Sequence, residues 1–375
     1  MDKFAKGTGI VCEYNPFHKG HAYQIECVKN MGAEFVVCAM SGDFTQRAQA
    51  SFQDKLVRAE NAVRNGADIV LEIPFPFSSM SAEGFARAGV CVLEDSGLCS
   101  SFAFGSESAD VEKLRKAADV LDSAFHKEVV ALQKNEPNLP YAAAREKLIC
   151  EKLTDEYSDL VRKPNDILAI EYLKANKNLC PIAIKRETPR GGYDENFASS
   201  SYIRKTLFNK EGEQRALRGL PEDYNFERIY KDDSGFYRHI LLSLMQKNPN
   251  DLTAFAEVQK GCEYSIVKNA RKAESYDELC SLLSSKTLTD AKIRRMLLFS
   301  FFGVQKSILK QKPLYTQVLC TSEKGRKMLK KYAEDRKMIV ASRVSDIKKD
   351  DKAFEQYEFS RKAGEILEKC RKIMQ

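Results

Sequence analysis

Short apolar runs alternate with amphipathic stretches through the first 210 residues of the chain. The runs with the character of buried strands are 8–14, 34–40, 67–74, 100–107 and 180–187. Between them, apolar residues recur at helical spacing from about Gly20 and over 52–66, 81–97 and 110–175. Strands separated by helices indicate βαβ units around a mainly parallel sheet. We therefore predict an α/β, doubly wound, Rossmann-like domain over 1–211.

The strand signals stop near residue 212, and the pattern changes. Residues 212–311 have helical spacing and predict a helical domain, which the Lys312-Pro313 pair ends. Two further apolar runs and two charged helical stretches follow, and they predict a small basic α/β unit over 312–375. We expect three domains, with the ligand of the first at the carboxyl ends of its strands.

Composition narrows the class of protein. Of the 375 residues, 43% are hydrophobic and 30% charged, which is typical of a soluble globular protein. No apolar run approaches the roughly 20 residues that span a bilayer, and the start has no signal-peptide cleavage site. Eleven cysteines without a C-x-x-C pair argue against a disulfide framework and against a zinc site. We expect a cytoplasmic protein with no membrane partner and no protein-held metal.

One loop holds two of the four histidines of the chain, His18 and His21 of "HKGH", directly after the first apolar run. Helix starts leave backbone N–H groups unpaired, and these attract phosphate. Imidazoles beside them can donate to phosphate oxygens and stabilise charge as a phosphoryl bond breaks. Gly20 leaves room for close approach, and Pro16 fixes the turn. A pair that only caps a helix is the alternative, but the pattern favours binding of a nucleotide phosphate.

A turn of three serines, "ASSSYIRK" over 198–205, lies near the far end of the same domain. Ser199, Ser200 and Ser201 can cap a helix and hold phosphate, while Arg204 can pair with the β- and γ-phosphates. A plain serine N-cap is the simpler alternative. Together with the histidine loop, this turn resembles the HxGH nucleotidyltransferase superfamily, whose members attack the α-phosphate of a nucleoside triphosphate and release pyrophosphate.

Further strings narrow this resemblance to one family. "GIVCEYNPFHKGH" (9–21), "AMSGDFTQR" (39–47), "FGSE" (104–107), "KPNDIL" (163–168) and "IKRE" (184–187) occur in this order, and "GCEYSIVKNARK" (261–272), "EKGRKML" and "SRVSDI" follow. Together they resemble the bacterial tRNA(Met) cytidine acetate ligase family over almost the whole chain. The resemblance implies an ATP-dependent ligase that makes acetyl-adenylate from acetate. It then acetylates N4 of the wobble cytidine of elongator tRNA(Met), giving N4-acetylcytidine and releasing AMP and pyrophosphate.

The same resemblance implies which residues hold ATP. His18, His21 and Arg204 would be catalytic. The ATP contacts would be Gly9, Ile10, Val11, Glu13, Tyr14, Asn15, Pro16, Phe17, His18, Gly20, His21, Gly105, Asn165, Arg186, Ser200 and Ser201. Two positions depart from the family pattern: Asp166 stands where a second Asn is common, and Arg190 lies in an unusually glycine-rich loop. ATP is expected as substrate with Mg²⁺ bound to it, because no local carboxylate cluster indicates a metal site.

The net charge of +7 and the basic C-terminal segment suggest a polyanionic partner such as RNA. Lysines and arginines recur in "VKNARK" (267–272), "KIRR" (292–295) and "KGRKMLKK" (324–331). Solvated helix faces are the alternative reading of these stretches. The expected tRNA contacts are Arg47, Lys268, Arg271, Lys272, Arg294 and Arg295. The oligomeric state cannot be inferred from the sequence.

Two other functions stay open at this stage. A small-molecule adenylyltransferase, acting on a phosphorylated vitamin or nucleotide, shares the same two motifs but usually ends with the sheet domain. A non-enzymatic RNA-binding protein could keep a vestigial nucleotide site. Turnover of ATP separates the second from the enzymes, and the identity of the acceptor separates the two enzymes.

Overall fold

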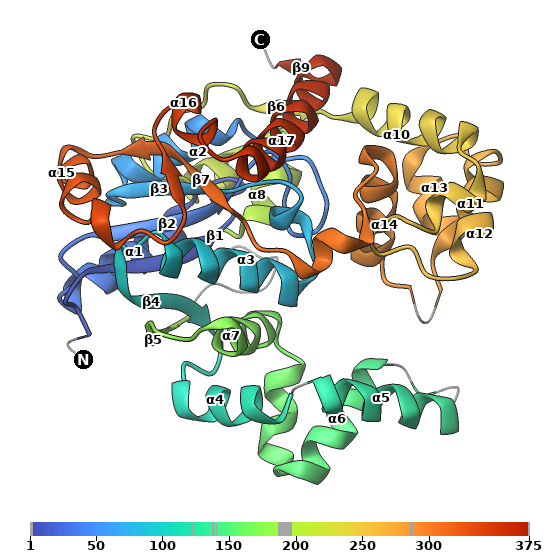
Figure 1. The fold of residues 1–375 in the computed structure, drawn as a ribbon, viewed down its shortest axis with the longest axis horizontal. Helices are drawn as coiled ribbons and strands as arrows, with labels where there is room; N and C mark the ends of the chain where they lie inside the picture. Colours follow the sequence, from blue (N-terminus) through green and yellow to red (C-terminus); the bar gives the residue numbers. More distant parts are fainter. Residues whose placement is uncertain are drawn as a thin grey trace.

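A seven-stranded sheet forms the centre of the molecule (Figure 1). The computed structural model describes residues 3–121, 123–136, 139, 141–186, 197–285 and 288–373. The strands of the sheet are β1 (Gly7–Cys12), β2 (Val36–Ser41), β3 (Ile69–Ile73), β4 (Cys99–Ser106), β5 (Cys180–Lys185), β7 (Tyr315–Thr321) and β8 (Ile339–Ala341). Their spatial order is β5-β4-β1-β2-β3-β7-β8. The first five strands are parallel, which confirms the predicted doubly wound α/β fold.

The chain reverses its direction across the sheet beside β1. It runs outward from β1 through β2 to β3, then returns to the other side of β1 with β4 and β5. The carboxyl ends of β1 and β4 therefore diverge at a topological switch point, where open α/β sheets bind their ligands. The histidine loop follows β1, and Gly105 lies near the end of β4.

Both faces of the sheet are covered, which explains why the strands appear as unbroken apolar runs. Side chains alternate along a strand. Val36, Cys38 and Met40 of β2 therefore join the core on the side of α1 (Lys19–Asn30) and α2 (Lys55–Arg64). Val37 and Ala39 face the other core, which contains the apolar side of α3 (Ala82–Asp95).

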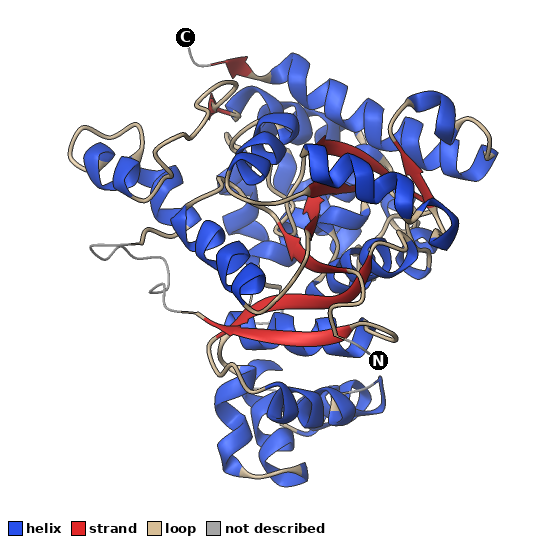
Figure 2. Cartoon of the chain, turned by 90° about the vertical axis from the view of Figure 1, so that its left-hand side faces the viewer, coloured by secondary structure: helices blue, strands red, loops and turns tan. Residues whose placement is uncertain are grey.

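The remaining elements of the first 220 residues lie around this sheet. The helices are α4 (Val111–Val120), α5 (Ser123–Asn135), α6 (Tyr141–Lys152), α7 (Pro164–Ala175), α8 (Ser200–Thr206) and α9 (Glu213–Arg218), with short 3₁₀ turns η1 (Phe77–Ser79) and η2 (Asp155–Val161). Helices α4 to α6 project beyond the β5 edge of the sheet (Figure 2). Helix α7 packs on α3 and α4, so it joins this projection to the sheet.

A group of helices follows, in the region where the sequence predicts them. It contains α10 (Ser234–Gln246), α11 (Pro249–Leu252), α12 (Cys262–Ala270), α13 (Tyr276–Leu283), α14 (Asp290–Phe302) and the turn η3 (Lys306–Lys310). The sequence does not predict one pairing here: the short strand β6 (Tyr230–Asp232) pairs with β9 (Lys372–Ile373) in antiparallel fashion. Strands of two or three residues carry too little pattern to be recognised.

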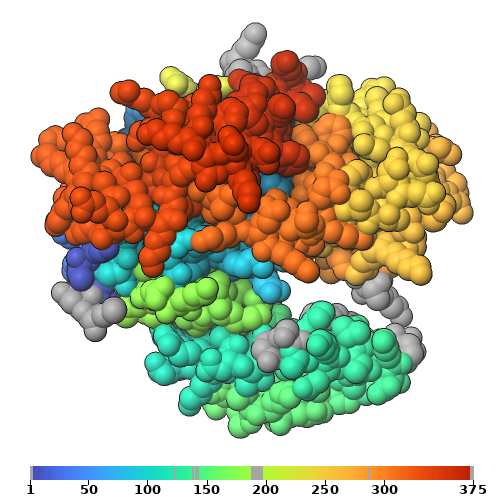
Figure 3. Space-filling model, viewed as in Figure 1, coloured from blue at the N-terminus to red at the C-terminus, as the bar shows by residue number. Residues whose placement is uncertain are grey.

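The C-terminal segment extends the main sheet. Its strand β7 pairs antiparallel with β3, and β8 pairs parallel with β7. Its helices are α15 (Glu323–Lys331), α16 (Val344–Ile347) and α17 (Asp351–Cys370), with the turn η4 (Ala333–Asp335). The ring of Phe359 in α17 stacks on Phe75 at 5.8 Å between centroids. In Figure 3 this segment lies directly over the sheet domain and beside the helical group. The division into three domains stays a prediction, but 312–375 shares a sheet with 1–211.

All eleven cysteines are free thiols in this structure. Within the described residues, none of the helices combines the length and the apolar character needed to cross a bilayer.

Candidate functional site

His18 and His21 are stacked on one another at the start of α1. Their ring centroids lie 3.6 Å apart with an interplanar angle of 24°. His18 is the N-cap residue of the helix, and its Nδ1 accepts a hydrogen bond from the backbone N–H of Gly20 at 3.0 Å. The backbone N–H of His18 in turn donates to Nδ1 of His21 at 3.2 Å. The two rings therefore form a reciprocal capping box in place of the usual Ser and Glu.

These two hydrogen bonds determine where each ring carries its proton. A nitrogen that accepts a hydrogen bond from an N–H group cannot itself be protonated. Both Nδ1 atoms are acceptors, so the proton of each neutral ring lies on Nε2. Capping thus uses one side of each imidazole and leaves the Nε2–H groups as donors for a ligand.

Both rings are neutral at physiological pH. Burial, reinforced by the positive charge of Arg186, lowers the pKa of His18 to about 3. Burial also lowers the pKa of His21 well below its usual value, with smaller contributions from His18 and Arg186. Paired groups with strongly shifted pKa values are typical of functional sites. Here they supply neutral hydrogen-bond donors that need no proton uptake before an anion binds.

The serine turn lies against the histidine loop. The guanidinium of Arg204 donates to the backbone carbonyl of Asn15, and Ser200 Oγ donates to that of Pro16 at 3.2 Å. Ser199 caps α8 by accepting from the N–H of Tyr202, and its hydroxyl lies 3.1 Å from that of Ser201. The two motifs form one site although almost the whole domain separates them in sequence.

Gly105, Asn165 and Arg186 lie on the other side of the histidines. Arg186 follows β5, and its guanidinium donates to Oδ1 of Asn165 at 3.3 Å. Asn165 stands in the first turn of α7 and donates to Glu107 at 2.9 Å. A methyl group added at Gly105 would meet no protein atom within 4 Å, because this part of β4 faces open space. A ligand can therefore lie directly against the strand.

A cleft of about 440 Å³ joins these groups, a size typical of small-molecule sites. Its polar lining includes Glu13, Asn15, His21, Gln46, Arg47, Asn165, Arg186, Ser200 and Arg204. Its apolar lining comes from Ala82, Phe85, Phe104, Ile167, Leu168 and Tyr172. A smaller pocket adjoins it and adds His18, Gly20 and Lys185. The three arginines make the cleft suitable for a polyanion such as a triphosphate.

Several of the expected ATP contacts have their side chains in the core. Ile10, Tyr14 and Phe17 are at most 1% exposed, so only their backbone can reach a ligand. Val11 packs against the core and Pro16 is buried in the turn. Gly9 lies within β1, where an added Cβ would stand 2.6 Å from Leu93. Its function in this structure is to let α3 approach the strand, and it does not line the cleft.

The two departures from the family pattern have different outcomes. Asp166 is buried and structural: its Oδ1 accepts from the hydroxyls of Ser106 and Ser108 and from the N–H of Ser108, and thereby shapes the turn after β4. Arg190 lies outside the described residues.

Arg58 is a structural residue of the site that the sequence does not reveal. It is fully buried, and its guanidinium donates to the backbone carbonyls of Glu13, Gly42 and Gln53. It thereby joins the loops that follow β1 and β2. Its neighbour Lys55 pairs with Asp43 at 3.0 Å and with the buried Glu72 at 2.8 Å. The only sequence signal is that both cations lie in an otherwise amphipathic helix, where exposure is the usual expectation.

The expected tRNA contacts divide into two groups. Lys268, Arg271 and Lys272 are exposed at the end of α12, and Arg47 is exposed at the mouth of the cleft. Arg295 is only 8% exposed and pairs with Glu257 at 3.4 Å. Arg294 pairs with Asp277 and Asp290 and lies over the ring of Tyr276. Both arginines of α14 are engaged within the protein, so the expected exposed cationic face is absent at these two positions.

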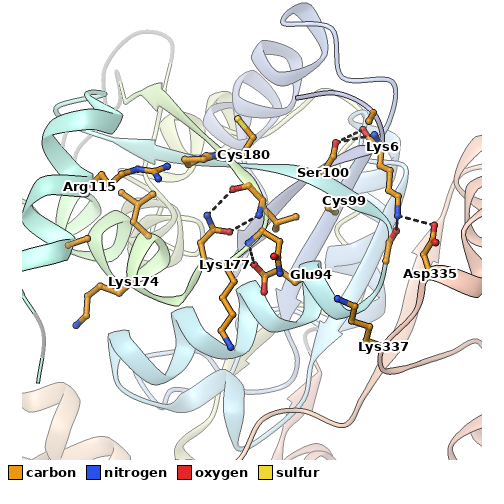
Figure 4. A pocket seen from close by; sticks show the side chains of 18 of the residues that line it. Lys6, Glu94, Cys99, Ser100, Arg115, Lys174, Lys177, Cys180, Asp335 and Lys337 are labelled. Carbon is orange, nitrogen blue, oxygen red and sulfur yellow. Dashed lines mark hydrogen bonds and ion pairs between the residues drawn. The ribbon is translucent and has the colours of Figure 1, made fainter. Parts of the chain in front are cut away.

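A larger cavity, of about 1260 Å³, lies elsewhere. It opens at the amino ends of β4 and β5, beside Cys99 and Cys180 (Figure 4). Lys6 pairs there with Asp335 at 2.9 Å, and Glu94 accepts from the backbone N–H groups of Lys177 and Asn178. Doubly wound sheets bind ligands at the opposite ends of their strands. We therefore place the candidate site in the smaller cleft.

Among the residues that the structure describes, no cluster of three or more His, Cys, Asp or Glu side chains forms a potential metal site.

Comparisons with known proteins identify the family of this chain. The family model for the HIGH nucleotidyl transferases matches residues 5–374. Curated relatives named tRNA(Met) cytidine acetate ligase include proteins of Lysinibacillus sphaericus and Clostridium perfringens. The Lysinibacillus sphaericus protein is 33% identical, and the match covers 91% of this chain and 90% of that protein. The Clostridium perfringens protein is 31% identical, and the match covers 92% of this chain and 91% of that protein.

Two solved structures of a protein of this kind are similar to the structure of this chain. The crystal structure of Thermotoga maritima TmcAL bound with alpha-thio ATP has a TM-score of 0.86 at 28% identity, covering 97% of this chain and 94% of that one. Its apo form has a TM-score of 0.87 at 29% identity, covering 96% and 93%. The chain therefore belongs to the HIGH nucleotidyl transferase family and, within it, to the family of the tRNA(Met) cytidine acetate ligases.

Proposed function

We propose that this protein is an ATP-dependent ligase that activates acetate as acetyl-adenylate and acetylates N4 of the wobble cytidine of elongator tRNA(Met). AMP and pyrophosphate are released. The observation that carries the proposal is the pair of neutral histidines at the switch point, each with Nδ1 used for capping and Nε2–H left as a donor. The names of the relatives and the ATP analogue in the Thermotoga maritima structure support the choice of substrates.

Activation is the first step. A carboxylate oxygen of acetate attacks the α-phosphorus of ATP, and pyrophosphate leaves in line with it. His18 and His21 donate to the phosphate oxygens as charge develops on them. Ser200, Ser201 and Arg204 hold the leaving pyrophosphate, while Gly105, Asn165 and Arg186 hold the nucleoside and its α-phosphate. The site works chiefly by position and electrostatics, because the bonds that change belong to the substrates.

Transfer is the second step. The wobble base must leave its stack to reach the acetyl-adenylate, since its reacting amino group is otherwise inaccessible. The apolar wall of Phe85, Phe104 and Tyr172 can accept the flat face of a base. Arg47 at the mouth and the exposed cations of α12 are the proposed contacts for tRNA phosphates.

Mg²⁺ would accompany ATP and reduce the charge on its phosphates. The described residues offer no carboxylate cluster for an ion held by the protein alone, and Mg²⁺ commonly keeps several waters and binds through substrate phosphates.

Exchange of labelled pyrophosphate into ATP, with and without acetate, tests the proposal. The informative variant is His18→Asn, whose side-chain oxygen stands where Nδ1 stands and keeps the cap, but which has no Nε2–H. His239→Asn, at an exposed histidine of α10, is the matched control.

We expect acetate-dependent exchange in the native chain and in the control, and a loss of at least about 100-fold in His18→Asn. Absence of exchange with acetate, with or without tRNA, would contradict the proposal. Activity with a phosphorylated vitamin or nucleotide as acceptor would then identify a small-molecule adenylyltransferase.

A further inference from the structure

Glu13 is the one acidic side chain among the described residues that line the cleft. It stands just after β1, between the histidine loop and the loop that carries Gln46 and Arg47. All other charged groups of the lining are the cations Arg47, Arg186 and Arg204. The family resemblance counts Glu13 among the ATP contacts, but its carboxylate repels phosphates. Only the backbone of Glu13 is therefore suited to the triphosphate, and the side chain is suited to a different partner.

Only one of the two carboxylate oxygens of Glu13 has a hydrogen-bond partner among the described residues. Oε1 accepts a hydrogen bond of 2.6 Å from the backbone N–H of Gln46. The backbone carbonyl of Glu13 accepts from the buried Arg58, so both ends of the residue are fixed. Within the described part of the chain, Oε2 has no hydrogen bond and Glu13 has no ion pair. Glu13 thus contributes to the wall of the cleft a fixed carboxylate with one oxygen that has no hydrogen-bond partner among the described residues.

A free carboxylate oxygen accepts hydrogen bonds and cannot donate them. Among nucleobase edges, the N4 amino group of cytosine is the partner that Glu and Asp select, and uracil presents a carbonyl there instead. We propose that Oε2 of Glu13 accepts a hydrogen bond from the N4 amino group of the target cytidine and removes its proton during acetyl transfer. This inference rests on the proposed function and assigns one residue to its second step.

The proposed step is balanced in atoms and electrons. The N4 lone pair attacks the carbonyl carbon of acetyl-adenylate, and an N–C bond forms. The C–O bond to phosphate breaks, and AMP leaves with that electron pair. The proton that N4 loses passes to Oε2 of Glu13. Arg186 keeps the departing AMP in the cleft, and Arg47 stands at the mouth of the cleft.

The test separates the two half-reactions in the full-length protein. Glu13→Gln keeps an oxygen for the N–H of Gln46 but cannot take a proton. Glu13→Asp keeps the carboxylate and shortens its reach, and Glu26→Gln removes an exposed carboxylate of α1 as a matched control. Acetate-dependent pyrophosphate exchange reports activation. Single-turnover incorporation of labelled acetate into unmodified elongator tRNA(Met) reports transfer.

We expect Glu13→Gln to slow transfer by about 100-fold or more, in the range of general-base catalysis, and to slow exchange by less than about threefold. Glu13→Asp should recover part of the transfer rate, and Glu26→Gln should transfer as fast as the native chain. Equal losses in both assays would overturn the inference, because they would assign Glu13 to ATP or its Mg²⁺. Unchanged transfer would overturn it as well. Absence of both activities in the native chain would instead contradict the proposed function.

Discussion

Arg204 donates a hydrogen bond to the carbonyl oxygen of Asn15, although the two residues are 189 positions apart in the chain. Burial lowers the pKa of Arg204, and the negative charge of Glu13 partly offsets this effect. The guanidinium thus joins the two ends of the domain and still presents donors to the cleft, since Arg carries five N–H groups in a planar fork. Lys cannot perform both functions with one ammonium group.

Arg204→Lys should therefore separate phosphate binding from stability. We expect the KM for ATP in pyrophosphate exchange to rise about tenfold or more, because a point charge replaces a bidentate donor. The free energy of unfolding should fall by only about 1–2 kcal/mol, the cost of one lost hydrogen bond. Exchange kinetics and urea denaturation measure the two quantities, and an unchanged KM would show that Arg204 serves the fold alone.

The histidine pair predicts a particular dependence of stability on pH. The pKa of His18 is about 3 in the folded protein and that of His21 is well below its usual value, whereas both are near 6.5 in an unfolded chain. Below pH 6.5 the unfolded chain binds protons that the folded chain does not, so stability falls as the pH decreases from about 6.5 toward 3. Each histidine contributes roughly 1.4 kcal/mol per pH unit to this slope.

Urea denaturation between pH 7.5 and 5 measures this slope. His18→Asn removes one of the two titrating rings and keeps the cap, so its free energy of unfolding should decline less steeply than that of the native chain. Parallel curves would show that His18 is not held neutral by the fold.

Two glycines of the central sheet, Gly9 in β1 and Gly105 in β4, should respond to alanine in opposite ways. At Gly9 a Cβ would stand 2.6 Å from Leu93, whereas at Gly105 it would meet no protein atom within 4 Å. Gly9→Ala should destabilise the protein by about 1–3 kcal/mol through overpacking. Gly105→Ala should leave the free energy of unfolding within about 0.5 kcal/mol and weaken ATP binding instead. Thermal unfolding and equilibrium titration with ATP distinguish the two, and tight ATP binding by Gly105→Ala would remove this residue from the proposed site.

Substitution of the cationic residues of the helical group should affect tRNA binding at some positions and stability at others. A triple variant with alanine at Lys268, Arg271 and Lys272 should bind tRNA more weakly. The slope of log binding constant against log salt concentration should also become shallower, by the equivalent of up to about three phosphate contacts. Arg295→Ala should destabilise the fold, because it leaves the largely buried Glu257 without its partner. Fluorescence titrations at several salt concentrations measure the slope. An unchanged slope in the triple variant would show that this end of α12 does not face the tRNA.

The sequence predicts the sheet and the two phosphate motifs because their signals are local. An apolar run bounded by glycine or proline forms a strand almost wherever it packs. Each of the two motifs behind the phosphate hypothesis is a stretch of a few consecutive residues. The function of Gly9 is not predictable in this way, since close approach to Leu93 depends on how α3 crosses the sheet. The same holds for Arg58 and Arg295, whose burial depends on tertiary partners far away in the chain.

The C-terminal segment illustrates the same limit at the level of topology. Its elements follow from their patterns, but nothing in "LYTQVLC" indicates that this strand pairs antiparallel with β3. Strand pairing between distant segments depends on which sheet edge is left open after the first domain has formed. The pairing extends the catalytic sheet and brings α17 over Phe75.

The most direct test of the central claim is an analysis of all products formed from ATP, labelled acetate and unmodified elongator tRNA(Met). The account predicts N4-acetylcytidine at the wobble position, with one AMP and one pyrophosphate released for each acetyl group transferred. A tRNA with uridine at that position should accept no acetyl group. Formation of ADP in place of AMP, or labelled tRNA without N4-acetylcytidine, would contradict it.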